Sequence, residues 1–201
     1  MKRPIQTGIV AGVAILAAFF FFATLARATL YAPELQIEVP QAEQNAPLAE
    51  VPKGNGPGRL QIPQIKVDAK IQYVGLNAKG NMGVPSNYSD VAWYKYGSLP
   101  GHVGSAVIDG HVDNGLGLRG VFKDLEKLKI GDDVYVLNKE GTKVHFQVTD
   151  IGRYNYKEVP TKRLFNRGDD AYLNLITCGG TWVKDEKTYN EGIVVYTTLV
   201  R

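Results

Sequence analysis

The amino-acid sequence predicts a mainly β domain, with its strands closed or nearly closed into a barrel, behind an N-terminal transmembrane helix. From Gly58 to the end of the chain, short runs that alternate apolar and polar residues are separated by turn residues, the pattern of β-strands. This part of the chain shows little helical periodicity. Residues 8–26, in contrast, carry no charge and are long enough to cross a bilayer core of about 30 Å as a helix.

The flanking charges predict the orientation of that helix. Lys2 and Arg3 precede the apolar stretch and Arg27 follows it, which favours a cytoplasmic N-terminus and an extracellular remainder. We therefore expect residues 1–30 to be a single-pass anchor in the cell membrane. A cleaved signal peptide is the competing interpretation, because Ala26-Arg27-Ala28 has the small-x-small form of a cleavage site.

Residues 31–57 are rich in Pro, Glu, Gln, Ala and Asn and have no sustained hydrophobic period. This composition predicts an extended, weakly ordered linker that lifts a domain off the membrane.

The expected domain, residues 58–201, contains seven or eight candidate strands. The strand patterns lie in residues 59–76 (interrupted at Pro63), 105–111, 132–154 (a hairpin), 172–178 and 192–200. One short helix is expected over residues 121–128, where Phe122, Leu125 and Leu128 have helical spacing. Many short strands with few helices favour a barrel over a sandwich.

The composition excludes several classes of function. The formal net charge is +3 and the basic residues are scattered, so no nucleic-acid partner is expected. A single cysteine permits neither an internal disulfide nor a zinc site made of several thiolates. The carboxylate pairs 132–133 and 169–170 fit solvated turns. We expect no metal and no cofactor.

The lone cysteine, Cys178, is the first candidate for chemistry. It ends the apolar run LNLITC, and Gly179-Gly180 follow it. A free thiol outside the membrane is unusual, since exported proteins generally pair their cysteines or lack them. A buried, inert cysteine is the structural alternative. Its place at a strand end, followed by two glycines, favours instead a displayed nucleophile.

A nucleophilic thiol needs a base, and the chain has three histidines. His145 alternates within a strand and His102 lies in a Pro-Gly-His-Val-Gly loop. His111 ends the strand SAVIDGH, a placement that mirrors that of Cys178. We expect His111 and Cys178 to meet at one rim of the barrel.

These residues carry a resemblance to a known family. GSAVIDGHVD followed by LNLITCGG resembles the sortases, the membrane-anchored cysteine transpeptidases of Gram-positive cell surfaces, with the Leu-x-Thr-Cys signature at 175–178. Residues 62–71, 83–85, 93–113 and 129–136 also match. Within the family, the CGG after the cysteine and the VVY of the last strand are most similar to class F sortases.

The resemblance implies an eight-stranded sortase-type barrel with one or two short helices. It also implies that Cys178 attacks the Thr–Gly carbonyl of a Leu-Pro-x-Thr-Gly-like sorting signal on a secreted protein. His111 would protonate the leaving amine and later deprotonate the incoming one. The acyl-enzyme would pass to an amine of a cell-wall precursor or pilin, or to water. Thr177 would help to shape the groove.

The sequence departs from the family at one position. Sortases carry an arginine at the start of the last strand, and here that position is Gly192, or Asn190 two residues earlier. Losing one oxyanion donor costs roughly 100- to 1,000-fold in rate. We expect Asn190 or Arg163 to take the place of the arginine, with Arg167 as a further candidate. Because none of them supplies a charge at the family position, we expect the enzyme to be altered or slow.

Three other interpretations remain open. A sortase-fold protein that binds peptide without turnover is favoured by the missing arginine. L,D-transpeptidases place a histidine close to the nucleophile, which ITCGG lacks. A redox role has no resolving cysteine. Finally, Trp93, Tyr94 and Tyr96 are expected to pack a loop against the barrel, with an aromatic binding platform as the alternative.

Overall fold

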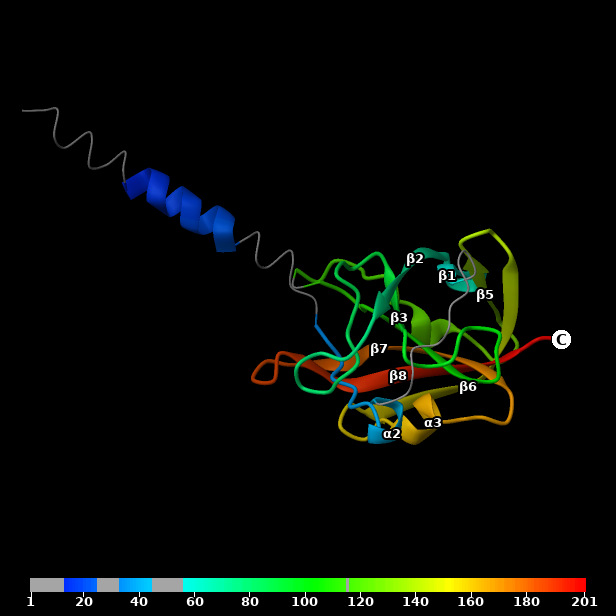
Figure 1. The fold of residues 1–201 in the computed structure, drawn as a ribbon. Helices are drawn as coiled ribbons and strands as arrows, with labels where there is room; N and C mark the ends of the chain where they lie inside the picture. The colour runs from blue at the N-terminus through cyan, green and yellow to red at the C-terminus, as the bar shows by residue number, and fades with distance from the viewer. Residues whose placement is uncertain (1–12, 25–32, 45–55, 115) are drawn as a thin grey trace, which may run out of the picture.

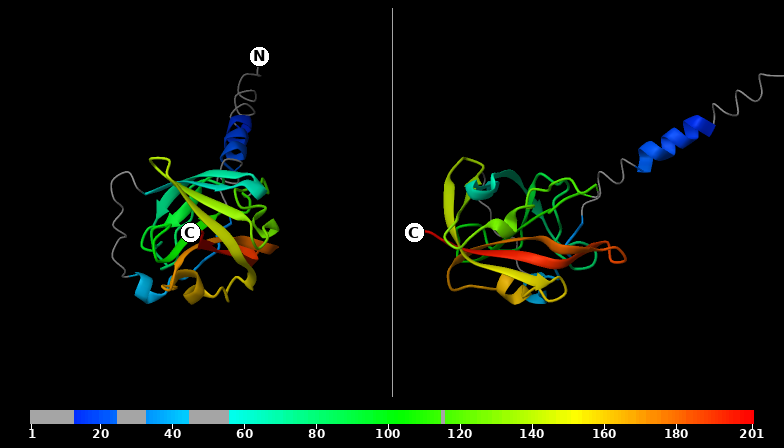
Figure 2. Two further views of the ribbon diagram at one scale, coloured as in Figure 1. Left: turned by 90° about the vertical axis from the view of Figure 1, so that its right-hand side faces the viewer. Right: turned by 180° about the vertical axis from the view of Figure 1, so that it is seen from behind.

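The computed structural model describes residues 13–24, 33–44, 56–114 and 116–201. In these ranges eight strands close into a single barrel with the order β1-β2-β3-β4-β7-β8-β6-β5 (Figure 1). The left view of Figure 2 shows the strands wrapping around one core. The expected mainly β barrel with few short helices is therefore confirmed.

Most element bounds follow the sequence patterns, but the strands expected at 172–178 and 192–200 extend to residue 183 and from residue 188, and a strand at 91–94 was not expected. The strands are β1 Pro57–Ile62, β2 Val67–Val74, β3 Val91–Tyr94, β4 Gly104–Gly110, β5 Asp133–Asn138, β6 Lys143–Asn155, β7 Ala171–Val183 and β8 Thr188–Leu199. The short helices are α2 Gln41–Gln44 and α3 Thr161–Phe165, with 3₁₀ turns η1 Pro63–Ile65 and η2 Leu125–Lys127. The break expected at Pro63 is the turn η1, because proline fits the first position of a helical turn.

The helix expected over residues 121–128 is wrong in its type. The structure has turns there and the 3₁₀ turn η2. Phe122, Leu125 and Leu128 are nevertheless buried, at 0%, 0% and 4% exposure. Their spacing of three matches the three residues per turn of a 3₁₀ helix, so consecutive turns present them to the same core.

Residues 13–24 form a helix within the expected membrane segment. None of the helices in the described ranges combines the length and apolarity needed to span a bilayer. Residues 8–12 and 25–26 of the predicted span lie outside the described residues.

The barrel has an apolar cluster inside and a second one on its outer face. The inner cluster includes Leu60, Ile108, Phe146, Leu173 and Val195, all at 0% exposure. The outer cluster joins residues of β7 and β8 to α3 and to the extended segment 33–39, and α2 lies beside α3 on this face (Figures 1 and 2). The outer cluster matters for function because it contains Cys178.

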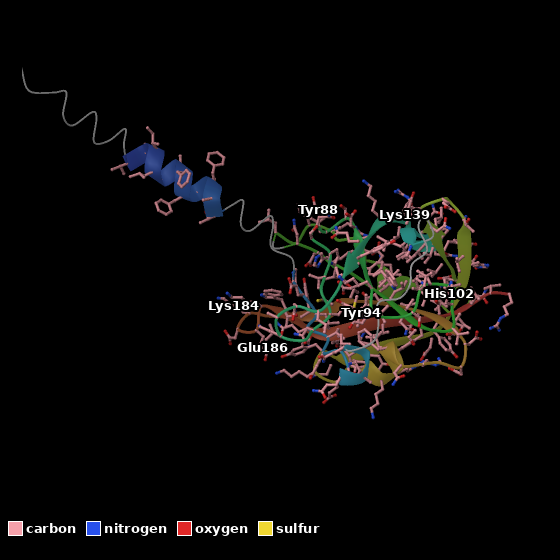
Figure 3. The ribbon with its side chains drawn as sticks, viewed as in Figure 1. Tyr88, Tyr94, His102, Lys139, Lys184 and Glu186 are labelled. Atoms are coloured by element: carbon pink, nitrogen blue, oxygen red, sulfur yellow. The ribbon has the colours of Figure 1, made fainter. Side chains whose placement is uncertain are left out.

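The aromatic residues at 93–96 pack rather than form a platform. Trp93 and Tyr94 are fully buried, and Trp93 Nε1 donates a hydrogen bond to the carbonyl oxygen of Ser98 at 3.2 Å. Tyr94 lies in the middle of the domain in Figure 3 and packs edge-on against Phe165 of α3.

Candidate active site

The sheet topology brings His111 and Cys178 to the same end of the barrel. β4 and β7 are parallel neighbours, with Ile108 opposite Leu175 and Asp109 opposite Ile176. His111, directly after β4, and Cys178, within β7, each lie two residues beyond the Asp109–Ile176 pair of these two parallel strands. Adjacent strands lie about 4.8 Å apart, so the two side chains start from neighbouring positions.

A peptide carbonyl group lies at both side chains. The oxygen of Pro33 is 3.3 Å from Nδ1 of His111 and accepts a long hydrogen bond from Sγ of Cys178 at 3.8 Å. Nε2 of His111 faces the carbonyl oxygen of Pro85 at 2.9 Å. Because both imidazole nitrogens face acceptors, the doubly protonated ring can donate at both contacts, whereas a neutral ring can donate at one.

The expectation that the Cys178 thiol is displayed at the end of a strand is wrong. Cys178 lies within β7, which continues to Val183 and pairs with β8 beyond the cysteine, with Trp182 opposite Tyr189. Its side chain is buried, with the residue 3% exposed. Gly179 and Gly180 form part of an irregularity in the ladder instead of ending it. The segment that covers the sulfur is itself an extended peptide.

The site is unfavourable for a thiolate while it is covered. Burial raises the pKa of the Cys178 thiol well above its ordinary value, and the nearby Asp109 carboxylate adds to the rise. Burial also raises the pKa of Asp109 to about 8, with the charge of Glu34 acting in the same direction and the Gly110 amide opposing it. Both shifts favour the uncharged, protonated forms of these two groups.

Thr177, which was expected to help shape the groove, is buried beside Cys178 and lines the same cavity. Its hydroxyl donates a 2.6 Å hydrogen bond to the carbonyl oxygen of Gly110, the residue before His111. Successive side chains on a strand point to opposite faces, so Thr177 and Cys178 face opposite sides of the sheet. Thr177 thus ties the two chain segments that carry His111 and Cys178 together.

The position of the missing family arginine is occupied by apolar groups. Gly192 lies directly opposite Cys178 in the β7–β8 ladder. A Cβ atom on Gly192 would lie 2.9 Å from Cδ2 of Leu35 and 3.0 Å from Cγ2 of Val159. Leu35, from the N-terminal segment, thus fills the space into which a side chain at position 192 would project.

The expected substitutes for that arginine are engaged elsewhere. Oδ1 of Asn190 accepts a 2.6 Å hydrogen bond from the Thr181 amide in the hairpin. Arg163 pairs with Asp150 at 2.6 Å and stacks over the ring of Tyr196. Arg167 stacks over Tyr172 and donates to its hydroxyl. In the part of the chain that the structure describes, none of the three has a contact with Cys178.

The other two histidines lie away from the site, as expected. His102 is exposed, and Figure 3 places it at the opposite end of the domain from Lys184 and Glu186 at the tip of the β7–β8 hairpin. His145 contacts Asp133 at 2.8 Å and stacks on Tyr135.

Sequence reasoning did not identify a second polar group near Cys178. Asp113 is 4% exposed; its Oδ2 accepts a hydrogen bond from the Tyr189 hydroxyl at 2.5 Å and lies 3.6 Å from Nζ of Lys123. Tyr189 and Lys123 help to line a cavity of about 190 Å³ that Cys178 also lines. The sequence could have pointed to Asp113 because it lies two residues after His111, but its residue type and position did not distinguish it from an ordinary loop residue.

Comparisons with known proteins agree with this architecture. A family model described as the sortase domain matches residues 60–200. A search of curated proteins found no match. Sortase C-1 from Actinomyces oris is 25% identical, with 72% of this chain and 73% of that chain covered and a TM-score of 0.54. Sortase A from Corynebacterium diphtheriae is 18% identical, with 80% of this chain and 78% of that chain covered and a TM-score of 0.59. A sortase D5 transpeptidase from Clostridium perfringens is 18% identical, with 76% of this chain and 83% of that chain covered and a TM-score of 0.55.

The solved structures that are less than 25% identical show the fold alone. The match to the family model, in contrast, covers most of the chain. The named neighbours are sortases of types A, C and D. The likeness to class F therefore stays a prediction.

Proposed function

The chain belongs to the sortase family, and on that premise we propose that it is a cysteine transpeptidase that cleaves a Leu-Pro-x-Thr-Gly-like sorting signal. Cys178 is the nucleophile and His111 is the general acid and base. The observation that carries the proposal is the convergence of both side chains on one carbonyl oxygen of an extended peptide, that of Pro33.

The proposed reaction has two halves. The Cys178 thiolate attacks the threonine carbonyl carbon of the donor, the C–N bond to glycine breaks, and His111 gives the leaving amine a proton. The resulting thioester is attacked by an incoming amine, His111 takes the proton of that amine, and the thiolate leaves. The acceptor is an amine of a cell-wall precursor or pilin, with water as the slower alternative.

The oxyanion of each tetrahedral intermediate needs donors that replace the family arginine. Arg163 and Asn190 are tied to other partners in the closed form. We propose that the chain works without an arginine at position 192, and that its turnover is slow for that reason.

Incubation of the protein with a Leu-Pro-x-Thr-Gly peptide and hydroxylamine tests the proposal. A threonine hydroxamate that forms with the wild type and is lost in Cys178→Ala supports transpeptidation. His102→Ala is the matched control, because His102 is exposed at the other end of the domain and its loss should leave the product unchanged. His111→Ala should remove the product.

A second candidate function is peptide binding without turnover. The apolar filling at Gly192 and the burial of Cys178 favour it. Saturable binding of the donor peptide, with neither hydroxamate nor an adduct on Cys178 at any pH from 6 to about 10, would support the binding protein over the enzyme.

We further propose that residues 8–26 anchor the protein in the cell membrane, with the domain outside. The uncharged stretch and the preceding Lys2 and Arg3 support this placement. Alkaline carbonate extraction of membranes from cells expressing the full chain should leave it in the pellet. Release of a chain that begins after Ala28 would instead support cleavage.

A further inference from the structure

The loop that follows His111 is held by backbone hydrogen bonds. The Phe122 amide donates to the carbonyl oxygen of His111 and the Gly120 amide donates to that of Val112, each at 3.0 Å. Gly120 allows this close approach, because a Cβ atom at its position would lie 2.2 Å from the His111 oxygen. These bonds fix the backbone of the two residues that precede Asp113.

Asp113 joins this loop to the hairpin that follows Cys178. The Tyr189 hydroxyl, from β8, donates to Oδ2 of Asp113 at 2.5 Å, and Nζ of Lys123 lies 3.6 Å from the same oxygen. Tyr189 lies opposite Trp182 in the β7–β8 ladder, beyond Cys178. We call Asp113, Tyr189 and Lys123 the clamp. The clamp connects the chain after one catalytic candidate with the chain after the other.

The carboxylate of the clamp is buried with few partners. The Asp113 side chain is 6% exposed, and its Oδ1 has no hydrogen-bond partner among the residues that the structure describes. Burying a carboxylate costs free energy, and the cost is larger when no opposite charge lies nearby. Lys123, whose side chain is 38% exposed, supplies the opposite charge from the solvent side. Tyr189 therefore holds Asp113 by a hydrogen bond, and Lys123 balances its charge.

The clamp lies near enough to Cys178 to act on the thiol. Tyr189 and Lys123 line the cavity of about 190 Å³ that Cys178 also lines. Burial and the Asp109 carboxylate raise the pKa of the Cys178 thiol most, and the charge of Asp113 adds to the rise. An Asp113 carboxylate without the opposite charge of Lys123 would make the thiolate harder to form.

Other polar and charged groups surround the thiol and the cavity, and substitutions in the clamp leave them in place. Those around the thiol are Asp109 of β4, Glu34 of the segment 33–39, the Thr188 hydroxyl of β8, and His111, which faces the same Pro33 oxygen. Glu126 and Arg153 line the cavity and pair with each other. Burial, and then the bond to Asp113, raise the pKa of Tyr189, so its hydroxyl stays a donor at neutral pH.

We infer that the clamp positions the catalytic pair: it holds the loop after His111 against the hairpin after Cys178, and it keeps the charge beside the thiol balanced. The hydroxyl of Tyr189 aligns the two segments. Lys123 allows the carboxylate of Asp113 to accept that hydroxyl without opposing the thiolate. That the pair acts on an acyl donor rests on the proposed function; the effect of the clamp on the thiol does not.

Alkylation of Cys178 by iodoacetamide tests the charge balance without requiring transpeptidation. Cys178 is the sole cysteine of the chain, so mass spectrometry of the full-length protein reads this thiol alone. Because the thiolate is the reacting form, the rate at a given pH follows the ionised fraction. At pH 8 we expect Lys123→Met to be slower than the wild type and Asp113→Asn to be faster, each by about threefold or more. The double variant, which loses both charges, should return to within about twofold of the wild type.

Two further variants separate charge from general damage to the fold. Lys127→Met removes a lysine that is 67% exposed and pairs with Asp124, and it should stay within about twofold of the wild type. Lys123→Arg keeps the charge and should retain the wild-type rate. A purely structural role would move Lys123→Met and Asp113→Asn in the same direction. Rates that move together, or that equal that of the wild type in both single variants, would overturn the charge balance.

Tyr189→Phe tests the alignment, because it removes the hydroxyl and keeps the ring. We expect the Gly120 and Phe122 amides to lose protection from hydrogen exchange, while the core amides of Leu173 and Val195 keep theirs. In the hydroxamate assay, kcat should fall by about tenfold or more, with the KM of the donor peptide changed by less than about threefold.

The matched control for this change is Tyr88→Phe, at an exposed tyrosine, which should alter neither readout. Full protection of both loop amides in Tyr189→Phe, or an unchanged kcat, would overturn the positioning role. A wild type that forms no hydroxamate would refute the proposed function instead. The exchange and alkylation results would then still decide whether the clamp holds the loop and balances the charge.

Discussion

The imidazole of His111 and the thiol of Cys178 face the same atom, the carbonyl oxygen of Pro33, at 3.3 and 3.8 Å. The two residues come from parallel neighbouring strands, which places them at the same end of the barrel. The geometry therefore brings together a candidate base and a candidate nucleophile, with a peptide group between them. The peptide in question is the protein's own segment 33–39, and its presence explains why Cys178 is buried.

Thr177→Val should destabilise the protein, because it removes the buried hydrogen bond to the Gly110 carbonyl while keeping the side-chain shape. We expect a loss of about 1–3 kcal/mol in the free energy of unfolding. Urea unfolding of the wild type and variant measures it. Thr181→Val, at an exposed position of the same strand, should change the free energy by less than about 0.5 kcal/mol. Equal losses in the two variants would refute a special role for the Thr177 hydroxyl.

Gly192→Ala should loosen the N-terminal segment, because the new methyl group would lie 2.9 Å from the end of the Leu35 side chain. We expect alkylation of Cys178 to become several-fold faster. The matched control is Gly168→Ala, where an added Cβ meets nothing within 4 Å. In the Leu35→Ala background the Gly192→Ala change should have little further effect, since the two residues are in contact and their effects are not additive. Additive effects would contradict the contact.

Asp109→Asn should remove a pH-dependent loss of stability. The pKa of this carboxyl is about 8 in the folded protein, against an ordinary value of 3.8, so the folded state binds the proton more tightly. Stability from this group is then fully present below about pH 4 and is lost as the pH rises through about 8. The wild type should lose up to several kcal/mol across this window relative to the variant. Chemical unfolding at pH 5 and 9 measures the difference, and parallel curves for both proteins would contradict the shift.

Two kinds of strand could be predicted from the sequence, those with alternating residues and the longer apolar runs of β4, β7 and β8. The alternation in β1, β2, β5 and β6 gave their positions, and the turn residues gave the hairpin. β3, Val91–Tyr94, was missed because it is only four residues long and all four are buried, so it shows neither alternation nor an apolar run as long as that of β4. The 3₁₀ turn η2 was expected as an α-helix, since residues spaced three apart suit either form over a few residues.

The proximity of His111 and Cys178 could be inferred from their matched strand positions, but the covering of both by residues 33–39 could not. The sequence ELQIEV does alternate, yet the prolines and polar residues around it are typical of a linker. Its docking depends on a groove built from residues far along the chain, such as Val159, Thr188 and Gly192. For the same reason the partners of Arg163 and Asn190 could not be foreseen.

The most direct test of the central claim is mass spectrometry of the full-length Leu35→Asp protein mixed with a Leu-Pro-x-Thr-Gly peptide and stopped in acid. We expect an adduct of Leu-Pro-x-Thr mass on Cys178, formed more slowly in the His111→Gln background and absent after Cys178→Ala. A protein whose thiol alkylates readily, yet which carries no adduct and leaves the peptide intact, would contradict it.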